Sequence, residues 1–115
     1  MKRYIRSSDD EYVSFSGWCN SSKGRSAFDK FCKDLEKEVR QNFDVSQYRL
    51  IKLQGYYRVE IYLNDGNDYE FKFDWLYLHG SLFEYGVNFS VYDYFNEIKE
   101  GIESGSALVE DSPTL

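Results

Sequence analysis

Two segments that alternate between apolar and polar residues constrain the fold of this chain more than any other feature. The alternation runs through residues 56–63 and 69–78, and its apolar positions are Val59, Ile61, Leu63, Tyr69, Phe71, Phe73 and Trp75. A period of two is typical of a β-strand with one buried face. The sequence Asn-Asp-Gly-Asn-Asp at 64–68 joins the segments, so we predict an antiparallel hairpin. A third strand is predicted at 48–53, just before it.

The register of this hairpin can be predicted from charge. A loop of three residues would set Glu60 opposite Glu70 and Arg58 opposite Lys72. A loop of five residues would set Glu60 opposite Lys72 and Arg58 opposite Asp74. Opposite charges stabilise a cross-strand pair and like charges destabilise it, by about 0.2–1 kcal/mol each. We therefore predict the five-residue loop.

Two helices are predicted from apolar residues spaced three and four apart. The first begins at Ser26, with Asp29 completing a capping box, and its buried face contains Ala27, Phe28, Phe31, Cys32, Leu35 and Val39. The second covers residues 91–105, is capped by Ser90 and ends at a glycine, and its buried face contains Val91, Phe95, Ile98 and Ile102.

The remaining segments predict less regular structure. Residues 2–6 are expected to form a short basic edge strand, and residues 7–25 mainly a loop. Residues 79–89 predict a turn followed by a short strand or an irregular aromatic run. The fold class is therefore α+β, a small antiparallel sheet of three to five strands with two helices packed on one face. We expect one domain over residues 1–103 and a flexible tail over 104–115.

Residue patterns that predict catalysis or cofactor binding are absent from the sequence. The single histidine, His79, falls at the predicted turn with no nucleophile beside it, so a surface or capping role is expected. Residues 64–68 offer oxygen ligands for Ca²⁺ but lack the spacing of an EF-hand loop, which favours a plain hairpin turn. With His79, Cys19 and Cys32 do not make a zinc site, and both thiols are interpreted as structural. We expect a protein that is not an enzyme and has no catalytic residues, metal or cofactor.

Charge is distributed unevenly along the chain. Residues 1–58 carry a net charge of +4 and residues 59–115 a net charge of −10. The candidate partner-binding acids are Asp93, Glu97, Glu100 and Glu103 in the last helix and Asp65, Asp68, Glu70 and Asp74 in and beside the hairpin. Tyr62, Tyr92 and Tyr94 are predicted to be exposed beside them, a combination common in protein interfaces. If these acids share one surface, it would attract basic grooves; the alternative is that both halves interleave and their charges cancel.

Three segments of the sequence give it a resemblance to small accessory proteins of phages and mobile elements in Gram-positive bacteria. They are the start MKRYIRSS, the aromatic hairpin YYRVEIYLNDGNDYEFKFDW and the ending DYFNEIKEGI. Among such proteins, anti-CRISPR proteins are often small, acidic and free of cofactors, and they inhibit an RNA-guided nuclease by binding it. The resemblance implies a target whose basic channels hold guide RNA or DNA. It transfers no functional residue to this chain.

We therefore expect a non-enzymatic inhibitor or DNA-mimicking decoy that binds a basic nucleic-acid-binding protein. One alternative is a nucleic-acid-binding module that uses the basic first half, with Lys2, Arg3, Arg6, Lys23, Arg25, Arg49, Lys52 and Arg58. Another is a self-associating domain, in which the basic half of one copy meets the acidic half of the next. No segment approaches the roughly 18 consecutive apolar residues of a membrane span, and the start lacks a signal peptide's apolar core. A cytoplasmic location in the bacterial host is expected.

Overall fold

The computed structural model describes residues 5–6 and 12–109 and confirms the α+β class. A short antiparallel pair, β1 (Ile5–Arg6) with β2 (Tyr12–Val13), precedes the main domain. The main sheet is a meander in the order β3 (Val45–Leu53), β4 (Tyr56–Leu63) and β5 (Asp68–Asp74). The helices are α1 (Phe15–Cys19), α2 (Ser22–Asn42), α3 (Trp75–Tyr85) and α4 (Tyr92–Ser104), with a 3-10 turn η1 (Gly86–Asn88). The predicted strand 2–6 is present at its last two residues, and its first three lie outside the described part.

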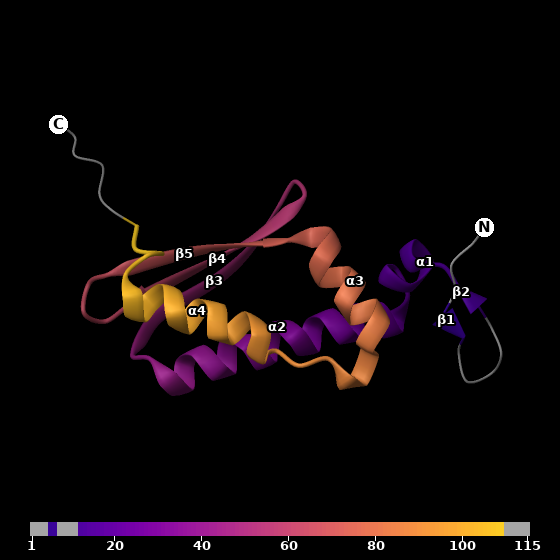
Figure 1. The fold of residues 1–115 in the computed structure, drawn as a ribbon, viewed down its shortest axis with the longest axis horizontal. Helices are drawn as coiled ribbons and strands as arrows, with labels where there is room; N and C mark the ends of the chain where they lie inside the picture. Colours follow the sequence, from indigo (N-terminus) through magenta and orange to yellow (C-terminus); the bar gives the residue numbers. More distant parts are fainter. Residues whose placement is uncertain (1–4, 7–11, 110–115) are drawn as a thin grey trace.

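Helices α2 and α4 lie side by side against one face of the sheet (Figure 1). The alternation in β4 and β5 sets the inner face, because Val59, Ile61, Tyr69, Phe71 and Phe73 are buried and the residues between them are half-buried or exposed. Leu63 is half-buried. The core between the layers contains Phe31, Leu35, Val39, Tyr57, Val59, Ile61, Tyr69, Phe71, Phe73, Phe95, Ile98 and Ile102. These include most of the apolar positions that the sequence predicted for both helices and for the hairpin.

The predicted hairpin register is wrong. Glu60 lies opposite Glu70 and Arg58 opposite Lys72, the arrangement of the three-residue loop. The amide of Leu63 donates to the carbonyl of Asn67, and Gly66 adopts a φ of 92°, which a glycine tolerates in a short turn. Because both registers keep the same residues on the inner face, burial does not distinguish between them.

Arg58 explains why two like-charged residues can lie opposite each other. Its Nε is 3.0 Å from Oε2 of Glu60 and 3.1 Å from Oε2 of Glu70, so one guanidinium bridges the two carboxylates. Arg49 adds a second ion pair to Glu60 at 3.3 Å. The compensation that the direct β4–β5 pairs lack therefore comes from Arg58, which is diagonal to Glu70, and from Arg49, which lies opposite Glu60 on β3.

The first long helix begins earlier than predicted. Ser21, not Ser26, is the N-cap, and its hydroxyl accepts a hydrogen bond from the amide of Gly24 at 3.1 Å. The predicted loop before it contains α1, which contacts α2 closely: a Cβ on Gly24 would lie 1.9 Å from the carbonyl oxygen of Trp18. Glycine is therefore required at position 24 for this approach.

Helix α3 replaces the end of the predicted strand 69–78, the predicted turn and the first part of the predicted strand or aromatic run at 79–89. Asp74 ends β5 and caps the helix, because its Oδ2 accepts from the amide of Tyr77 at 2.8 Å. Leu78 and Leu82 then bury one face of α3 at helical spacing. The continuing run of strand-favouring aromatic residues concealed this change of period in the sequence.

The last helix matches its prediction except at its start. Helix α4 ends at Gly105, which has a φ of 77°, as the predicted glycine stop requires. Its N-cap is Val91, which has no side-chain hydrogen bond; Ser90 instead accepts from the amide of Tyr92. Beyond the helix, Ala107 and Val109 hydrogen bond with the free edge of β5. Residues 110–115 of the predicted tail lie outside the described part.

Candidate functional site

A cleft of about 510 Å³ lies between the end of β5, helix α3 and the first half of helix α4. The turn from β5 into α3 and the return through η1 place these three elements around it (Figure 1). Its lining combines acids, tyrosines and small polar groups: Lys72, Phe73, Asp74, Tyr77, Ser81, Tyr85, Asn88, Phe89, Ser90, Asp93, Tyr94 and Glu97. Three of the predicted acids, Asp74, Asp93 and Glu97, are thus brought to one cavity.

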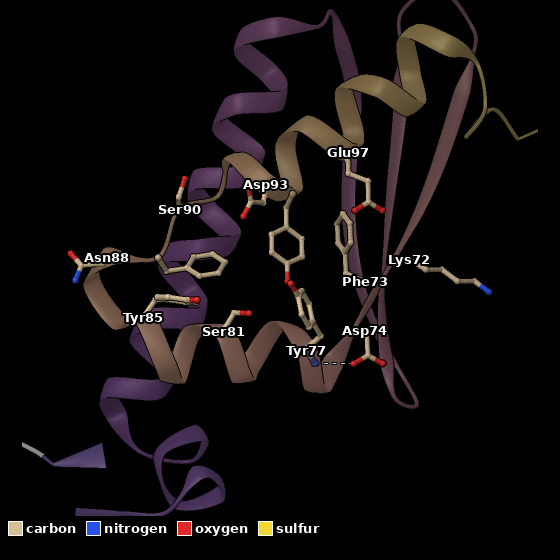
Figure 2. A pocket seen from close by; sticks show the side chains of 12 residues that line it. Lys72, Phe73, Asp74, Tyr77, Ser81, Tyr85, Asn88, Ser90, Asp93 and Glu97 are labelled. Atoms are coloured by element: carbon tan, nitrogen blue, oxygen red, sulfur yellow. Dashed lines mark hydrogen bonds between the residues drawn. The ribbon is translucent and has the colours of Figure 1, made fainter. Parts of the chain in front are cut away.

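The three carboxylates reach the cleft from two elements. Asp93 and Glu97 extend from α4, Glu97 toward Phe73 of β5, and Asp74 lies where α3 begins (Figure 2). The pKa of the Glu97 carboxyl is raised, first by partial burial and then by the neighbouring charge of Glu100. Ionisation of Glu97 is therefore less favourable than that of a fully solvated glutamate, and a cation in the cleft would offset that difference.

Tyr94 is buried, contrary to the prediction that it is exposed beside the acids. Its side chain is 8% exposed, and its ring makes edge contacts with Phe31 and Phe73 at centroid distances of 5.2 and 4.9 Å. The hydroxyl has no hydrogen-bond partner within the described part of the chain. Burial is the largest cause of its raised pKa, followed by the proximity of Tyr77, Glu97, Asp93 and Asp74. The hydroxyl therefore lies among the groups of the cleft.

Two exposed tyrosines on α3 belong to the cleft and were not predicted from the sequence. Tyr77 is 70% exposed and Tyr85 is 54% exposed. With Ser81 they repeat every four residues along α3, so they share the side of the helix that lines the cleft. That spacing is the signal that could have found them, had the segment been recognised as helical.

The other acids of the predicted surface are divided among three places. Glu100 lines a smaller hollow with Glu97 beside the end of α4, and Glu103 is exposed near the helix C-terminus. Asp65 and Asp68 lie at the β4–β5 turn, at the same end of the molecule as the end of α4 (Figure 1). Glu70 is on the outer face of the sheet, bridged to Arg58. Of the candidate acids, only Asp93 and Glu97 of α4 and Asp74 line the cleft.

The other two candidate tyrosines lie away from the cleft. Tyr92 is 55% exposed, and its hydroxyl is 3.5 Å from a carboxylate oxygen of Glu38 on α2. Tyr62 is on the outer face of the sheet, half-buried, and its hydroxyl donates to Glu60 at 2.8 Å. Both lie outside the lining of the cleft.

His79 is buried, contrary to its predicted surface position. Its Nε2 is 2.6 Å from the hydroxyl of Tyr57, and its ring packs against Phe28 and Trp75 at centroid distances of 4.9 and 4.6 Å. Burial, with a smaller effect of Lys52, lowers its pKa. His79 is thus part of an aromatic cluster between α2, α3 and β4.

Both cysteines are free and half-buried. Burial, together with the charges of Asp29 and Glu36, raises the pKa of the Cys32 thiol to about 11. A thiol with this pKa is protonated near neutral pH and is a poor nucleophile. In the part of the chain that the structure describes, there is no group of three side chains that could hold a metal ion and no helix suited to crossing a membrane.

Comparisons with protein-family models, with curated proteins and with solved structures gave no match to this chain. The candidate site therefore depends on its own geometry. It offers three carboxylates, a buried phenol hydroxyl and exposed aromatic rings, a set suited to binding cations.

Proposed function

We propose that this chain is a binding protein that inhibits a basic nucleic-acid-binding protein by occupying its positively charged channel. The observation that carries this proposal is the convergence of Asp74, Asp93 and Glu97 on one cleft rimmed by exposed tyrosines. Exposed carboxylates along a helix attract lysines and arginines that otherwise hold phosphates, and exposed tyrosines add contact area. An RNA-guided nuclease is a protein with such channels, and inhibition of one by this chain is the specific form of the proposal.

The proposed surface contrasts with the rest of the charged residues. On α2, Lys30 pairs with Asp34 at 2.6 Å and Arg40 with Glu36 at 2.8 Å. On the sheet, Arg49 and Arg58 pair with glutamates. These cations of the first half are therefore partly neutralised by nearby acids, which favours an acidic binding surface over a nucleic-acid-binding module.

The experiment is a binding measurement with a purified RNA-guided nuclease and other basic nucleic-acid-binding proteins. We expect the wild-type chain to bind a member of this panel and to bind more weakly as salt is added, because screening weakens attraction between exposed charges. The double variant Asp93→Lys, Glu97→Lys is expected to lose about 100-fold in affinity or more, since reversing charges at an interface introduces repulsion.

A matched control separates the cleft from net charge. The double variant Asp29→Lys, Asp44→Lys changes net charge by the same amount at exposed positions outside the cleft. It should bind within about threefold of wild type, the small effect expected of distant screened charges. Equal losses in both double variants would contradict a specific role for the cleft, and a wild-type chain that bound none of the panel would contradict the proposed partner class.

A further inference from the structure

The cleft contains a buried hydroxyl that the fold itself does not use. Tyr94 is 8% exposed, and its hydroxyl has no hydrogen-bond partner among residues 5–6 and 12–109. Its ring is held by Phe31, Phe73 and Phe89, so the hydroxyl cannot turn away to solvent. Buried polar groups are nearly always paired, so an unpaired hydroxyl on a residue that lines a cleft is a candidate acceptor for a donor that enters the cleft.

The charges around this hydroxyl indicate which charge its partner should carry. Asp74, Asp93 and Glu97 line the same cleft. Lys72 also lines it, but its side chain points away from the other residues (Figure 2), and its Nζ lies 5.2 Å from the ring centroid of Tyr56 on the outer face of the sheet. A ligand inside the cleft would therefore meet the carboxylates of Asp93 and Glu97 and a phenol oxygen that can accept a hydrogen bond, which selects a cationic donor. Asp74 lies farther off and already accepts from the amide of Tyr77.

The spacing of the acceptors favours an extended organic cation over a metal ion. Within the described residues, these carboxylates are not close enough together to form a metal-binding group. The cleft has a volume of about 510 Å³ and exposed tyrosine rings on its α3 side. A guanidinium group has five donors in one plane and stacks on aromatic faces, whereas an ammonium group is a compact charge with three donors.

The edge of β5 beside the cleft suits a polypeptide. The amide of Glu70 donates to Ala107 and the carbonyl of Asp68 accepts from Val109, so the even-numbered residues of β5 direct their backbone groups away from β4. Lys72 is the next such residue and lines the cleft. Within the described residues, no loop or turn makes a hydrogen bond to the backbone amide or carbonyl of Lys72 on this edge. An extended segment could pair there while its side chain entered the cleft.

We propose that the cleft binds the guanidinium group of an arginine carried by an extended segment of a partner protein. The carboxylates of Asp93 and Glu97 and the Tyr94 hydroxyl accept its hydrogen bonds, and Tyr77 and Tyr85 flank it. The inference rests on the proposed function for the class of partner, and it adds the chemical group that is recognised.

The test is an NMR titration of the ¹⁵N-labelled full chain with short capped peptides that differ at one central residue. We expect the arginine peptide to shift amide signals of residues that line the cleft, and the citrulline peptide, which keeps the shape but loses the charge, to bind at least about tenfold more weakly. The lysine peptide should also bind more weakly. Equal binding of the citrulline peptide, or no shifts with the arginine peptide up to about 10 mM, would overturn the proposal.

The decisive variant is Tyr94→Phe, which removes the hydroxyl and keeps the packed ring. It should bind the arginine peptide about tenfold more weakly, the loss expected for one hydrogen bond to a charged group. Its thermal unfolding midpoint should equal or exceed that of wild type, because the folded chain loses only an unpaired buried group. Glu103→Gln, an acid on the same helix outside the lining, should bind as wild type does. Undiminished peptide binding by Tyr94→Phe would overturn the proposal.

Agmatine is a guanidinium compound without a peptide backbone, so it tests whether the cleft recognises a polypeptide or a free guanidinium compound. We expect it to bind at least about tenfold more weakly than the arginine peptide, and equal binding would overturn the assignment to a polypeptide. The peptide titration and the binding measurement with basic nucleic-acid-binding proteins can succeed or fail separately. Peptide binding without capture of any basic protein would refute the proposed partner class and leave the cleft chemistry standing, whereas the reverse would refute the arginine site alone.

Discussion

Gly101 lies where α4 packs on the sheet, and this packing leaves no room for a larger side chain. A Cβ there would lie 2.5 Å from Cε1 of Phe71 and 3.0 Å from Cβ of Ala107. Because Phe71 is buried, we expect Gly101→Ala to lower the free energy of unfolding by about 1–3 kcal/mol, the usual cost of overpacking a core. Urea denaturation measures this change.

Gly80 provides the matched control for this substitution. It also lies inside a helix, but an added Cβ would meet no atom within 4 Å. Gly80→Ala should therefore raise the free energy of unfolding by about 0.5–1 kcal/mol through helix propensity alone. Equal effects of the two substitutions would show that α4 does not approach the sheet as closely as described.

His79 makes stability depend on pH. Its pKa is lowered by burial and by Lys52, and the groups that face it are Tyr57, Phe28 and Trp75. Below about pH 6.5 the unfolded chain binds a proton at this histidine that the folded chain resists, so the free energy of unfolding should fall as the pH falls. Thermal unfolding between about pH 8 and pH 5.5, above the usual pKa of carboxyl groups, measures the slope.

The variant His79→Gln is the control for this pH dependence, because glutamine does not titrate. His79 is the only histidine in the chain. The variant is expected to be less stable at every pH, and its unfolding midpoint should vary less over this range than that of wild type. Identical slopes for the two proteins would contradict the lowered pKa of His79.

Among the elements, the β4–β5 hairpin depends on Arg58 to keep two glutamates opposite each other. Arg58→Met retains much of the side-chain volume but leaves Glu60 facing Glu70 without the bridging charge. We expect a loss of about 1 kcal/mol, since the ion pairs are half-exposed and the remaining pair repels. Adding Glu70→Gln to this variant should recover part of that loss in chemical denaturation. If the second substitution destabilised the protein further, the observed register would be contradicted.

Much of the element pattern follows from local periodicity. The period of two in β4 and β5, the helical spacing of α2 and α4 and the stop at Gly105 were all predicted from the sequence. The hairpin register was not, because Arg58 pairs with Glu60 on its own strand and with Glu70 diagonally across the hairpin, and a comparison of directly opposite residues includes neither contact. Helix α3 was missed because its capping residue, Asp74, is also the last residue of a strand.

The candidate site was only partly predictable, because some of its residues come together through contacts between distant segments of the chain. The acids of α4 share one face of a helix that the sequence specifies, so Asp93 and Glu97 were found together. Asp74 reaches them through the turn into α3, and Tyr94 is buried because Phe31 and Phe73 close over its ring. These contacts join distant segments of the chain, and no local pattern encodes them.

At the scale of the whole molecule, the two halves of the chain interleave in some places and remain separate in others. Arginines of the first half neutralise Glu60 and Glu70 on the outer face of the sheet. On α4, by contrast, Asp93, Glu97, Glu100 and Glu103 are exposed, and among the described residues they make no ion pair. The unpaired acids of α4 are therefore a smaller set than the acids of the whole second half, and two of them, Asp93 and Glu97, line the cleft.

In the proposed function, this surface takes the place of nucleic acid on a basic protein. The most direct test is a competition measurement, in which labelled DNA bound to a purified RNA-guided nuclease is titrated with the wild-type chain and with Asp93→Lys, Glu97→Lys. We expect the wild-type chain to displace the DNA in proportion to its concentration, less effectively as salt is added, and the variant to leave the DNA bound. If the chain bound the nuclease while the DNA stayed in place, or if the variant displaced it equally well, the proposed function would be contradicted.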